Sequence, residues 1–212
     1  MYRIVLKGGE GEIIEKKSRF IATVAPVADE QEACAFIENV KKKYWDARHN
    51  CSAFVIGEKA QLTRCSDDGE PSGTAGRPML EVLLGSEIRN VAVVVTRYFG
   101  GTLLGTGGLV RAYTQAVKAG LANCETGVMR MGVTLRIDTD YNNIGKVLFV
   151  LNERGVRLQS SDYSDKVSLT VQLPVEQRDE LEKTLIDATN ARAAIESLGE
   201  AFYVDKTNES FV

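Results

Sequence analysis

Residues 97–113 read Arg97-Tyr-Phe-Gly-Gly-Thr-Leu-Leu-Gly-Thr-Gly-Gly-Leu-Val-Arg-Ala-Tyr113 and connect a predicted strand to a predicted helix. The apolar run Val91–Val95 before them predicts a buried strand, and the periodicity from Leu109 to Leu121 predicts a helix. Five of the eleven residues from Tyr98 to Gly108 are glycine, so this backbone can approach a ligand without interference from Cβ atoms. Because a helix start offers unpaired N–H groups and two arginines flank the loop, the sequence predicts an anion-accepting loop.

The same loop also has a purely structural interpretation, since glycines permit tight turns and close packing at a strand–helix junction. It departs from the sharper phosphate-binding motifs. The dinucleotide fingerprint would need glycine where Val110 stands, and a P-loop would need lysine where Thr106 stands. Both interpretations stay open. Under the binding hypothesis, the contacting residues are Arg97, Tyr98, Phe99, Gly100, Gly101, Gly105, Gly107, Gly108 and Arg111.

The composition indicates a globular protein with a substantial core. The 212 residues are 44% hydrophobic and 26% charged, and no apolar run approaches the ~18 residues of a transmembrane helix. The N-terminus lacks the features of a signal peptide, so we expect a cytoplasmic protein. A net charge of -3 argues against a generally basic nucleic-acid coat, although there are local basic clusters at 16–19 and 41–43. The four widely spaced cysteines indicate reduced thiols.

The first half of the chain predicts mixed strands and helices. Apolar and β-branched runs predict strands at Phe20–Val24, Cys51–Ile56, Gln61–Cys65 and 91–96. Helical periodicity predicts helices from Asp29 to about Tyr44, over Pro78–Leu84, and from Leu109 to about Asn123. Asp29 is a suitable N-cap for the first of these helices.

The pattern restarts near Gly127, and we place a domain boundary between residues 128 and 129. The second half predicts a strand, a helix, two strands, a helix and a strand, over 131–137, 141–153, 156–160, 167–173, 175–188 and 193–204. This β-α-β-β-α-β order is the ferredoxin-like plan. We therefore expect an α+β protein with a first domain over 1–128, a ferredoxin-like domain over 129–205 and a frayed tail over 206–212.

A second motif, Ser66-Asp-Asp-Gly-Glu-Pro-Ser-Gly-Thr-Ala-Gly76, has no apolar periodicity and predicts a long loop. Its carboxylates could hold a magnesium ion beside a phosphate on the glycine loop, which would suit phosphoryl chemistry. Acidic residues in such loops are also ordinary turn formers, because Asp bonds back to its own backbone. The candidate site residues of this loop are Ser66, Asp67, Asp68, Glu70, Gly73 and Thr74.

The only histidine of the chain, His49, lies in a third motif, Asp46-Ala-Arg-His-Asn-Cys51. In a strand, His49 and Cys51 would point to the same face, where they could form a Cys–His nucleophile pair. A zinc site would need two further ligands, which the spacing does not supply. A hydrogen-bonded residue at the end of a strand is the simpler interpretation of His49. Asp46 and His49 are kept as candidate site residues.

Together the three motifs, Asp46–Cys51, Ser66–Pro78 and Val95–Tyr113, resemble the IMPACT family in its bacterial YigZ-type form, over roughly residues 15–125. The resemblance implies that the first domain has the fold of the second domain of ribosomal protein S5. It implies that the remainder is similar to a C-terminal domain of elongation factor G. Both of those relatives sit on the ribosome, and eukaryotic IMPACT proteins modulate a kinase that controls translation initiation. The resemblance therefore implies a role in translation.

Because polar loops gathered on a rigid scaffold usually form the working surface of a domain, we expect the three motifs to converge in space. We expect a non-enzymatic regulator of translation that binds RNA or a ribosome-associated partner, such as a translation factor, through the loops of the first domain. The arginines would contact phosphates, and Tyr98 and Phe99 would stack on unpaired bases. This hypothesis requires no catalytic residue, metal, cofactor, membrane or DNA specificity, and it leaves the oligomeric state open. One alternative is an enzyme acting on a phosphorylated small molecule, with His49 as acid or base. Another is a protein–protein module that uses the ferredoxin-like sheet.

Overall fold

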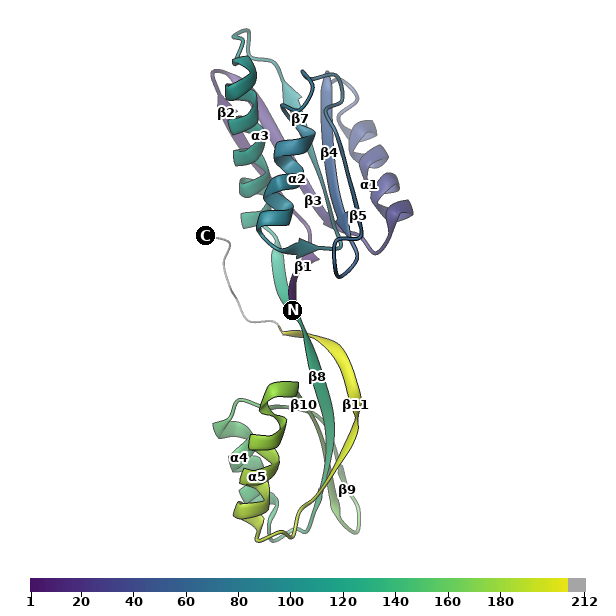
Figure 1. Cartoon of the computed structure of the whole chain (residues 1–212), viewed down its shortest axis with the longest axis vertical. Coiled ribbons are helices and arrows are strands. Elements are labelled where there is room, and N and C mark those ends of the chain that lie inside the picture. The colour runs from purple at the N-terminus through teal and green to yellow at the C-terminus, as the bar shows by residue number, and fades with distance from the viewer. Residues whose placement is uncertain (206–212) are drawn as a thin grey trace. The chain divides into compact units, whose positions relative to one another are not determined.

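A computed structural model describes residues 1–205 of the chain and divides them into two units, Tyr2–Val128 and Met129–Val204 (Figure 1). The tail predicted at 206–212 lies outside the described residues. The first unit contains β1 (Tyr2–Lys7), β2 (Gly9–Glu15), β3 (Ser18–Pro26), α1 (Glu30–Lys43), β4 (His49–Ile56), β5 (Leu62–Ser66), α2 (Gly76–Gly85), β6 (Ile88–Arg89), β7 (Val91–Tyr98) and α3 (Gly105–Ala122). The strand β8 (Glu125–Thr139) begins in the first unit and continues in the second. The α+β class predicted from the sequence is confirmed. No helix within residues 1–205 is long and apolar enough to cross a membrane.

The first unit is built on five antiparallel strands in the order β2-β3-β7-β4-β5. At the end of the central strand β7, Arg97 is paired with Phe20 on β3 and with His49 on β4. Because neighbouring strands run in opposite directions, the end of β7 meets the starts of β3 and β4 at one end of the sheet. The loops attached to these strands therefore gather at that end, where the candidate site lies.

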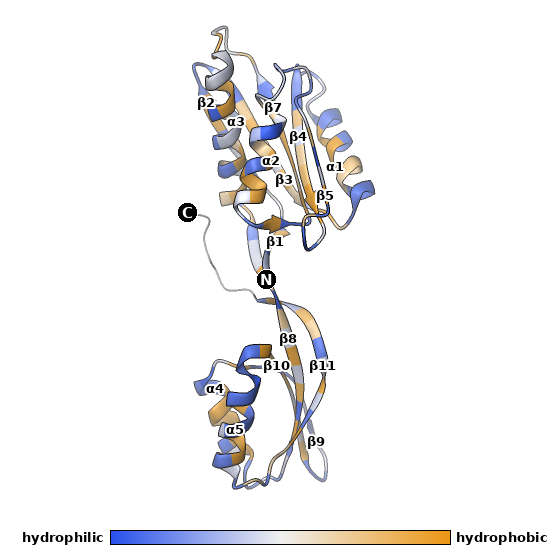
Figure 2. Cartoon of the chain, viewed as in Figure 1, coloured by the Kyte–Doolittle hydropathy of each residue, from blue (hydrophilic) through white to orange (hydrophobic). Residues whose placement is uncertain are grey.

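Helices cover both faces of this sheet (Figure 1). The helices α2 and α3 pack on one face against Val91, Val93 and Val95, and α1 packs on the other face against Ala92. Since the side chains of a strand alternate between its faces, a strand covered on both sides must be apolar throughout. This is why β7 is apolar from Val91 to Val95, before the polar residues at its end. Figure 2 shows how the covered strands differ from a helix on the surface. Hydrophobic residues lie along β3 and β4, whereas hydrophilic residues recur along α1.

The helix α1 begins as the sequence predicts. Asp29 precedes it with an extended backbone, and its side chain accepts a hydrogen bond from the Glu32 N–H at 2.9 Å. Such a cap satisfies one of the N–H groups that a helix start leaves without a partner. The acidic first turn and the lysines of the last turn both complement the helix dipole.

Two features of the first unit differ from the sequence-based expectation. The apolar periodicity begins at Leu109, but α3 itself begins at Gly105. Glycine is a poor helix former by about 1 kcal/mol per residue, so the composition of this first turn conceals its helical structure. The strand β2 was not predicted separately from β3, and the short strands β1 and β6 were also not predicted. They pair in parallel through Arg3 with Ile88 and Ile4 with Arg89, a ladder too short to leave a periodic pattern.

The second unit follows β8 with α4 (Ile144–Glu153), β9 (Arg157–Tyr163), β10 (Val167–Pro174), a 3₁₀ turn (Val175–Gln177), α5 (Arg178–Thr189) and β11 (Ala194–Asp205). β11 pairs with β8, and β10 is antiparallel to both β8 and β9, so the sheet order is β11-β8-β10-β9. Alternate residues of β8 and β10, such as Leu135 and Leu169, form one buried cluster with residues of α4 and α5. The predicted ferredoxin-like plan is confirmed.

The two units contain separate apolar cores, one formed by residues 5–121 and another by residues 133–193. We therefore expect the predicted domains, 1–128 and 129–205, to fold independently, because each fragment keeps its own core. Each fragment should give one cooperative thermal transition by circular dichroism and a dispersed amide spectrum by NMR. A fragment that stays unfolded while the full chain folds would show that the boundary is misplaced.

Candidate functional site

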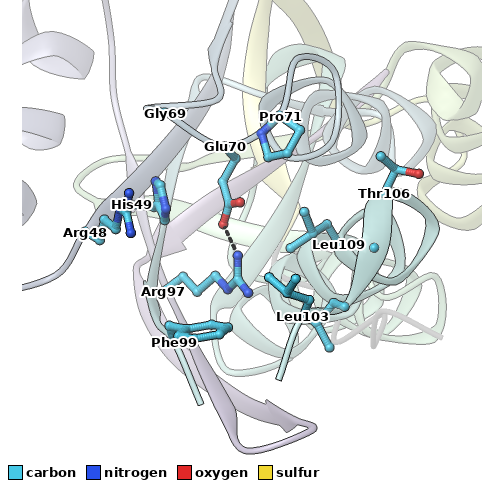
Figure 3. A pocket seen from close by; sticks show the side chains of 12 residues that line it. Arg48, His49, Gly69, Glu70, Pro71, Arg97, Phe99, Leu103, Thr106 and Leu109 are labelled. Atoms are coloured by element: carbon cyan, nitrogen blue, oxygen red, sulfur yellow. Dashed lines mark hydrogen bonds and ion pairs between the residues drawn. The ribbon is translucent and has the colours of Figure 1, made fainter. Parts of the chain in front are cut away.

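The three sequence motifs line one pocket of about 420 Å³ in the first unit (Figure 3). The predicted convergence of the motifs is thus confirmed. The histidine motif contributes Arg48 and His49, and the acidic loop contributes Gly69, Glu70 and Pro71. The end of β7, the glycine loop and the start of α3 contribute Arg97, Phe99, Leu103, Leu104, Gly105, Thr106 and Leu109.

A buried ion pair lies in this pocket. Arg97 Nη1 is 2.6 Å from Glu70 Oε1, and the two side chains are only 8% and 3% exposed. The Tyr113 hydroxyl donates to the same Glu70 oxygen at 2.8 Å. The Arg97 guanidinium also lies over the rings of Phe20 and Phe99, 5.4 and 5.7 Å from their centroids. Arg97 was predicted to be a flanking cation for phosphates, but its charge is largely balanced by Glu70.

One donor of Arg97 is left over by these contacts. Among the described residues, Arg97 Nε is buried and has no hydrogen-bond partner. A buried donor without an acceptor costs about 1–3 kcal/mol. Figure 3 shows the guanidinium in the pocket, between Glu70 and Phe99. The pocket is therefore bordered by a guanidinium whose donors are not all used within residues 1–205.

The acidic loop turns tightly at Asp68 and Gly69, whose φ angles are 41° and 85°. The Glu70 N–H donates to the Asp67 carbonyl at 2.9 Å, which closes a four-residue turn. Two successive residues with positive φ are the signature of a type I′ turn, for which Asp-Gly is a favoured sequence. The interpretation of this motif as a turn former is therefore confirmed.

The three carboxylates of the loop have separate sets of partners. Asp67 accepts three backbone N–H groups, Asp68 accepts the Asn50 N–H at 2.7 Å and Lys41 Nζ at 3.2 Å, and Glu70 binds Arg97. Within residues 1–205, no group of three His, Cys, Asp or Glu is placed to hold a metal ion. The structure thus contradicts the hypothesis of an acidic loop that holds magnesium.

Asp67 fixes the loop to the start of α2. Its carboxylate accepts the N–H groups of Gly73 at 2.8 Å, Ala75 at 3.0 Å and Gly76 at 2.8 Å. Burial by itself would raise the pKa of Asp67, but these three backbone hydrogen bonds outweigh burial and lower the pKa below its ordinary value. Asp67 is therefore a helix-capping residue and does not line the pocket.

The other acidic-loop candidates, Ser66, Gly73 and Thr74, also support the loop outside the pocket. Ser66 Oγ accepts the Asp68 N–H at 3.3 Å, and Thr74 Oγ1 donates to the Pro71 carbonyl at 2.6 Å. Gly73 has a φ of 76° and donates to Asp67. These contacts hold the turn that places Glu70.

His49 lines the pocket but does not pair with Cys51. His49 Nδ1 is 2.9 Å from the Asp68 carbonyl oxygen. Cys51 Sγ donates instead to the Asp67 carbonyl at 3.0 Å and lies 3.3 Å from the Tyr113 hydroxyl. Burial raises the pKa of Cys51 to about 12, so little thiolate forms at neutral pH. The hypothesis of a Cys–His nucleophile is therefore wrong, and His49 is the hydrogen-bonded strand-end residue of the simpler interpretation.

The glycines of the loop differ in whether the backbone at their position needs glycine. A Cβ at Gly100 would lie 2.0 Å from the Lys17 carbonyl carbon, so only glycine fits there. Gly101 and Gly105 have φ angles of 86° and 70°, which favour glycine. Gly107 has no such angle, and a Cβ there would meet nothing within 4 Å. A Cβ at Gly108 would meet only Leu104 Cβ, at 3.1 Å.

Some predicted binding residues lie outside this pocket. The Tyr98 hydroxyl donates to Asp46 Oδ1 at 2.7 Å, and neither residue lines the pocket. Arg111 is exposed and lines a second pocket of about 270 Å³, formed by Glu15, Lys16, Leu104, Gly108, Arg111, Ala112 and Gln115. Leu104 lines both pockets, so the two are neighbours. The structure therefore brings Arg97, Phe99 and Gly105 together and places Arg111 beside them.

Sequence reasoning missed several residues that shape the pocket. Arg48 lies inside the histidine motif, and its exposed position could have been inferred from its place before a strand. Leu103 is 83% exposed, but a single leucine in a glycine loop gives no sequence signal of exposure. Tyr113 follows Leu109 by four residues on the apolar face of α3, but nothing local predicts its bond to Glu70.

Comparison with known proteins gives matches over most of the chain. The model of the Impact N-terminal domain matches residues 16–121, and a domain of unknown function (DUF1949) matches residues 137–192. The IMPACT family member YvyE of Bacillus subtilis is 40% identical over 205 residues, which cover 97% of this chain and 94% of the relative. The IMPACT family member YigZ of Escherichia coli is 40% identical over 174 residues, 81% of this chain and 85% of the relative.

A solved structure also resembles the chain. It is described as the crystal structure of an hypothetical protein, and it is 35% identical with a TM-score of 0.56. The match covers 93% of this chain and 97% of the solved one. The similarity therefore extends through both units.

The capping role of Asp67 predicts a pH-dependent effect on stability. Asp67→Asn should lower the free energy of unfolding at neutral pH by about 1–2 kcal/mol, because the charged acceptor of three N–H groups is lost. Since the folded-state pKa of Asp67 is lowered, its contribution is full above about pH 4 and disappears as the pH falls through the folded-state value.

Urea denaturation of wild type and Asp67→Asn across a pH series should show the two curves converging in acid. Asp165→Asn is the matched control, because Asp165 is exposed in a turn of the second unit. A constant difference between wild type and Asp67→Asn down to pH 2 would contradict the capping role.

Alanine should have opposite effects on the free energy of unfolding at a loop glycine with positive φ and at one without it. Gly105→Ala should lower the free energy of unfolding by about 1–2 kcal/mol, because alanine is strained at positive φ. Gly107→Ala should raise it by about 0.5–1 kcal/mol, because alanine is the better helix former and its Cβ meets open space. Chemical denaturation of the two variants measures both effects, and a loss of stability in Gly107→Ala would contradict the helical assignment of this turn.

Proposed function

The chain belongs to the IMPACT family, and we propose that it regulates translation by binding unpaired RNA at the pocket of its first unit. The translation role rests on the family, and the RNA role rests on the chemistry of the pocket. The observation that carries the RNA role is an exposed aromatic ring beside unpaired cations and an uncapped helix start.

The aromatic ring is that of Phe99. It lines the pocket and is 56% exposed at the end of β7, beside Leu103, which is 83% exposed. Large apolar side chains next to each other on a surface favour a binding role, since they gain free energy when a partner covers them. Every nucleic-acid base has an apolar face that can stack on such a ring, with a contribution of about 1–3 kcal/mol per base.

The charges around the two neighbouring pockets support an anionic partner. Among their lining residues, four cations (Arg48, Arg97, Lys16 and Arg111) face two carboxylates (Glu70 and Glu15), and Glu70 is neutralised by Arg97. Within residues 1–205, Arg48, Lys16 and Arg111 form no ion pair. Their charge is therefore available to phosphates although the whole chain is acidic.

The uncapped helix start is that of α3. Leu104 stands at its N-cap position, and no side chain within the described part of the chain caps this start. The N–H groups of the first turn and the positive end of the helix dipole therefore favour an anion there. A phosphate of the RNA backbone is a suitable acceptor for these groups.

RNA binding by the full chain tests the proposal. An unstructured single-stranded RNA oligonucleotide should bind with an affinity that falls with salt, because phosphate contacts release counterions. Phe99→Ala should weaken binding by about five- to a hundredfold, through the loss of one stacked base. Arg48→Ala and Arg111→Ala should each reduce the salt slope by about 0.7. Filter binding across a salt series measures all three effects.

The chain offers matched controls for both kinds of change. Phe149 of the second unit is 64% exposed, so Phe149→Ala removes a similar ring elsewhere. Lys59→Ala removes a cation beyond the other end of β4, far along the sheet from the pocket. Neither control should change affinity or salt slope. Salt-insensitive or absent binding by wild type would overturn the RNA role.

The translation role has its own measurement. The purified chain should co-sediment with ribosomes at low salt and change the yield of a cell-free translation system, whereas Phe99→Ala should do so less. An effect on translation that Phe99→Ala fully retains would separate the translation role from this pocket.

A further inference from the structure

We propose that the pocket accepts a single nucleoside monophosphate unit, with its phosphate at the start of α3 and its base against Phe99. As a unit of RNA this ligand rests on the proposed function, and it extends that function by naming the ligand of the site. The same chemistry occurs in a free mononucleotide and in one unpaired nucleotide of an RNA, and the experiment below distinguishes these sources.

The size of the pocket suits one nucleotide. Its volume is about 420 Å³, within the range of roughly 300–1,000 Å³ that small-molecule sites occupy. Pro71, Leu104 and Leu109 supply apolar lining. A pocket of this size holds a ring and its attached groups, whereas a continuous strand would need a longer groove.

Two independent features place the phosphate. The first is the start of α3, an 18-residue helix whose first turn has no side-chain cap and whose Gly105 and Thr106 line the pocket. The second is Arg97, which is 6% exposed and whose Nε donor has no partner within residues 1–205. An anion in the pocket would accept hydrogen bonds from the N–H groups of the helix start and would lie beside the Arg97 guanidinium. Glu70 already occupies Nη1 of Arg97, so the added anion would be held by the helix start and by the guanidinium donors that Glu70 leaves free.

The backbone at this helix start is open to close approach. Thr106 and Gly107 are both exposed, and a Cβ at Gly107 would meet no protein atom within 4 Å. The Cα of Gly107 is therefore not crowded by other side chains. A phosphate at the helix start would meet an exposed backbone at Gly105, Thr106 and Gly107.

His49 supplies an acceptor on the other side of the pocket. Its Nδ1 lies 2.9 Å from the Asp68 carbonyl oxygen, which can only accept, so in neutral His49 the proton is on Nδ1. Nε2 of the neutral ring is then an acceptor, and the ring lines the pocket (Figure 3). A ribose hydroxyl or an amino group of a base would donate to it.

Titration calorimetry of the full chain tests this ligand directly. The probes are AMP, UMP, adenosine and inorganic phosphate. We expect each monophosphate to bind at least tenfold more tightly than adenosine or inorganic phosphate, because only the monophosphate uses both ends of the pocket. Equal affinity for AMP and inorganic phosphate would overturn the proposal.

A charge at the helix start separates binding from folding. Thr106→Glu should reduce AMP affinity at least tenfold, because its carboxylate competes with the phosphate, while the same charge favours the helix. The melting temperature should therefore stay at or above that of wild type. Gln31→Glu, in the exposed first turn of α1, adds the same charge at another helix start and should leave AMP affinity unchanged. Wild-type AMP affinity in Thr106→Glu would overturn the proposal.

Competition between AMP and the RNA oligonucleotide shows whether the pocket takes a free mononucleotide or one nucleotide of an RNA. It also distinguishes failure of the pocket ligand from failure of the proposed function. Displacement of RNA by AMP places one nucleotide of the RNA in this pocket. Mononucleotide binding without RNA binding would support the pocket and overturn the proposed function. RNA could also bind in a way that depends on Phe99 while mononucleotides neither bind nor displace it. That result would overturn the proposal of a mononucleotide ligand and leave the proposed function standing.

Discussion

The ion pair between Arg97 and Glu70 is the constraint on which the organisation of the site depends. Taking two charges out of water costs several kcal/mol per ion, and the pair recovers this only with good geometry and further hydrogen bonds. Here Tyr113 supplies a second bond to Glu70, and the rings of Phe20 and Phe99 face the guanidinium. The four contacts connect β7, β3, α3 and the acidic loop, so these elements must be placed together for either charge to be buried. Loss of one partner alone would leave an uncompensated charge, at a cost of about 3–5 kcal/mol.

This constraint also determines the chemistry of the pocket. Because Glu70 balances Arg97, the buried part of the pocket has no strong net charge, and the features that favour an anion are the helix start and the exposed Arg48. The acidic loop acts through its shape, since its type I′ turn presents Glu70 to Arg97 while Asp67 holds α2. Carboxylates that would suit a metal enzyme in the sequence are therefore used as structural acceptors.

Much of the fold and part of the site could be predicted from the sequence. The central strand β7, the capped helix α1 and the βαββαβ order were predictable because apolar periodicity and caps are local signals. The convergence of the three motifs was also predicted. The ion pair between Arg97 and Glu70 could not be predicted, because the two residues are 27 positions apart and their pairing depends on tertiary packing. Nor could the composition distinguish Gly105, which needs its positive φ, from Gly107, which does not.

That difference between the glycines bears on why the loop has its sequence. Gly100 and Gly105 are explained by the fold, through a close backbone contact and a positive φ. Gly107 is not, because alanine would fit there, and glycine in a helix costs about 0.5–1 kcal/mol relative to alanine. The same residue keeps the start of α3 free of a side chain next to the pocket. The destabilisation is thus explained if an external group must approach this backbone closely, which is what phosphate binding at the helix start requires.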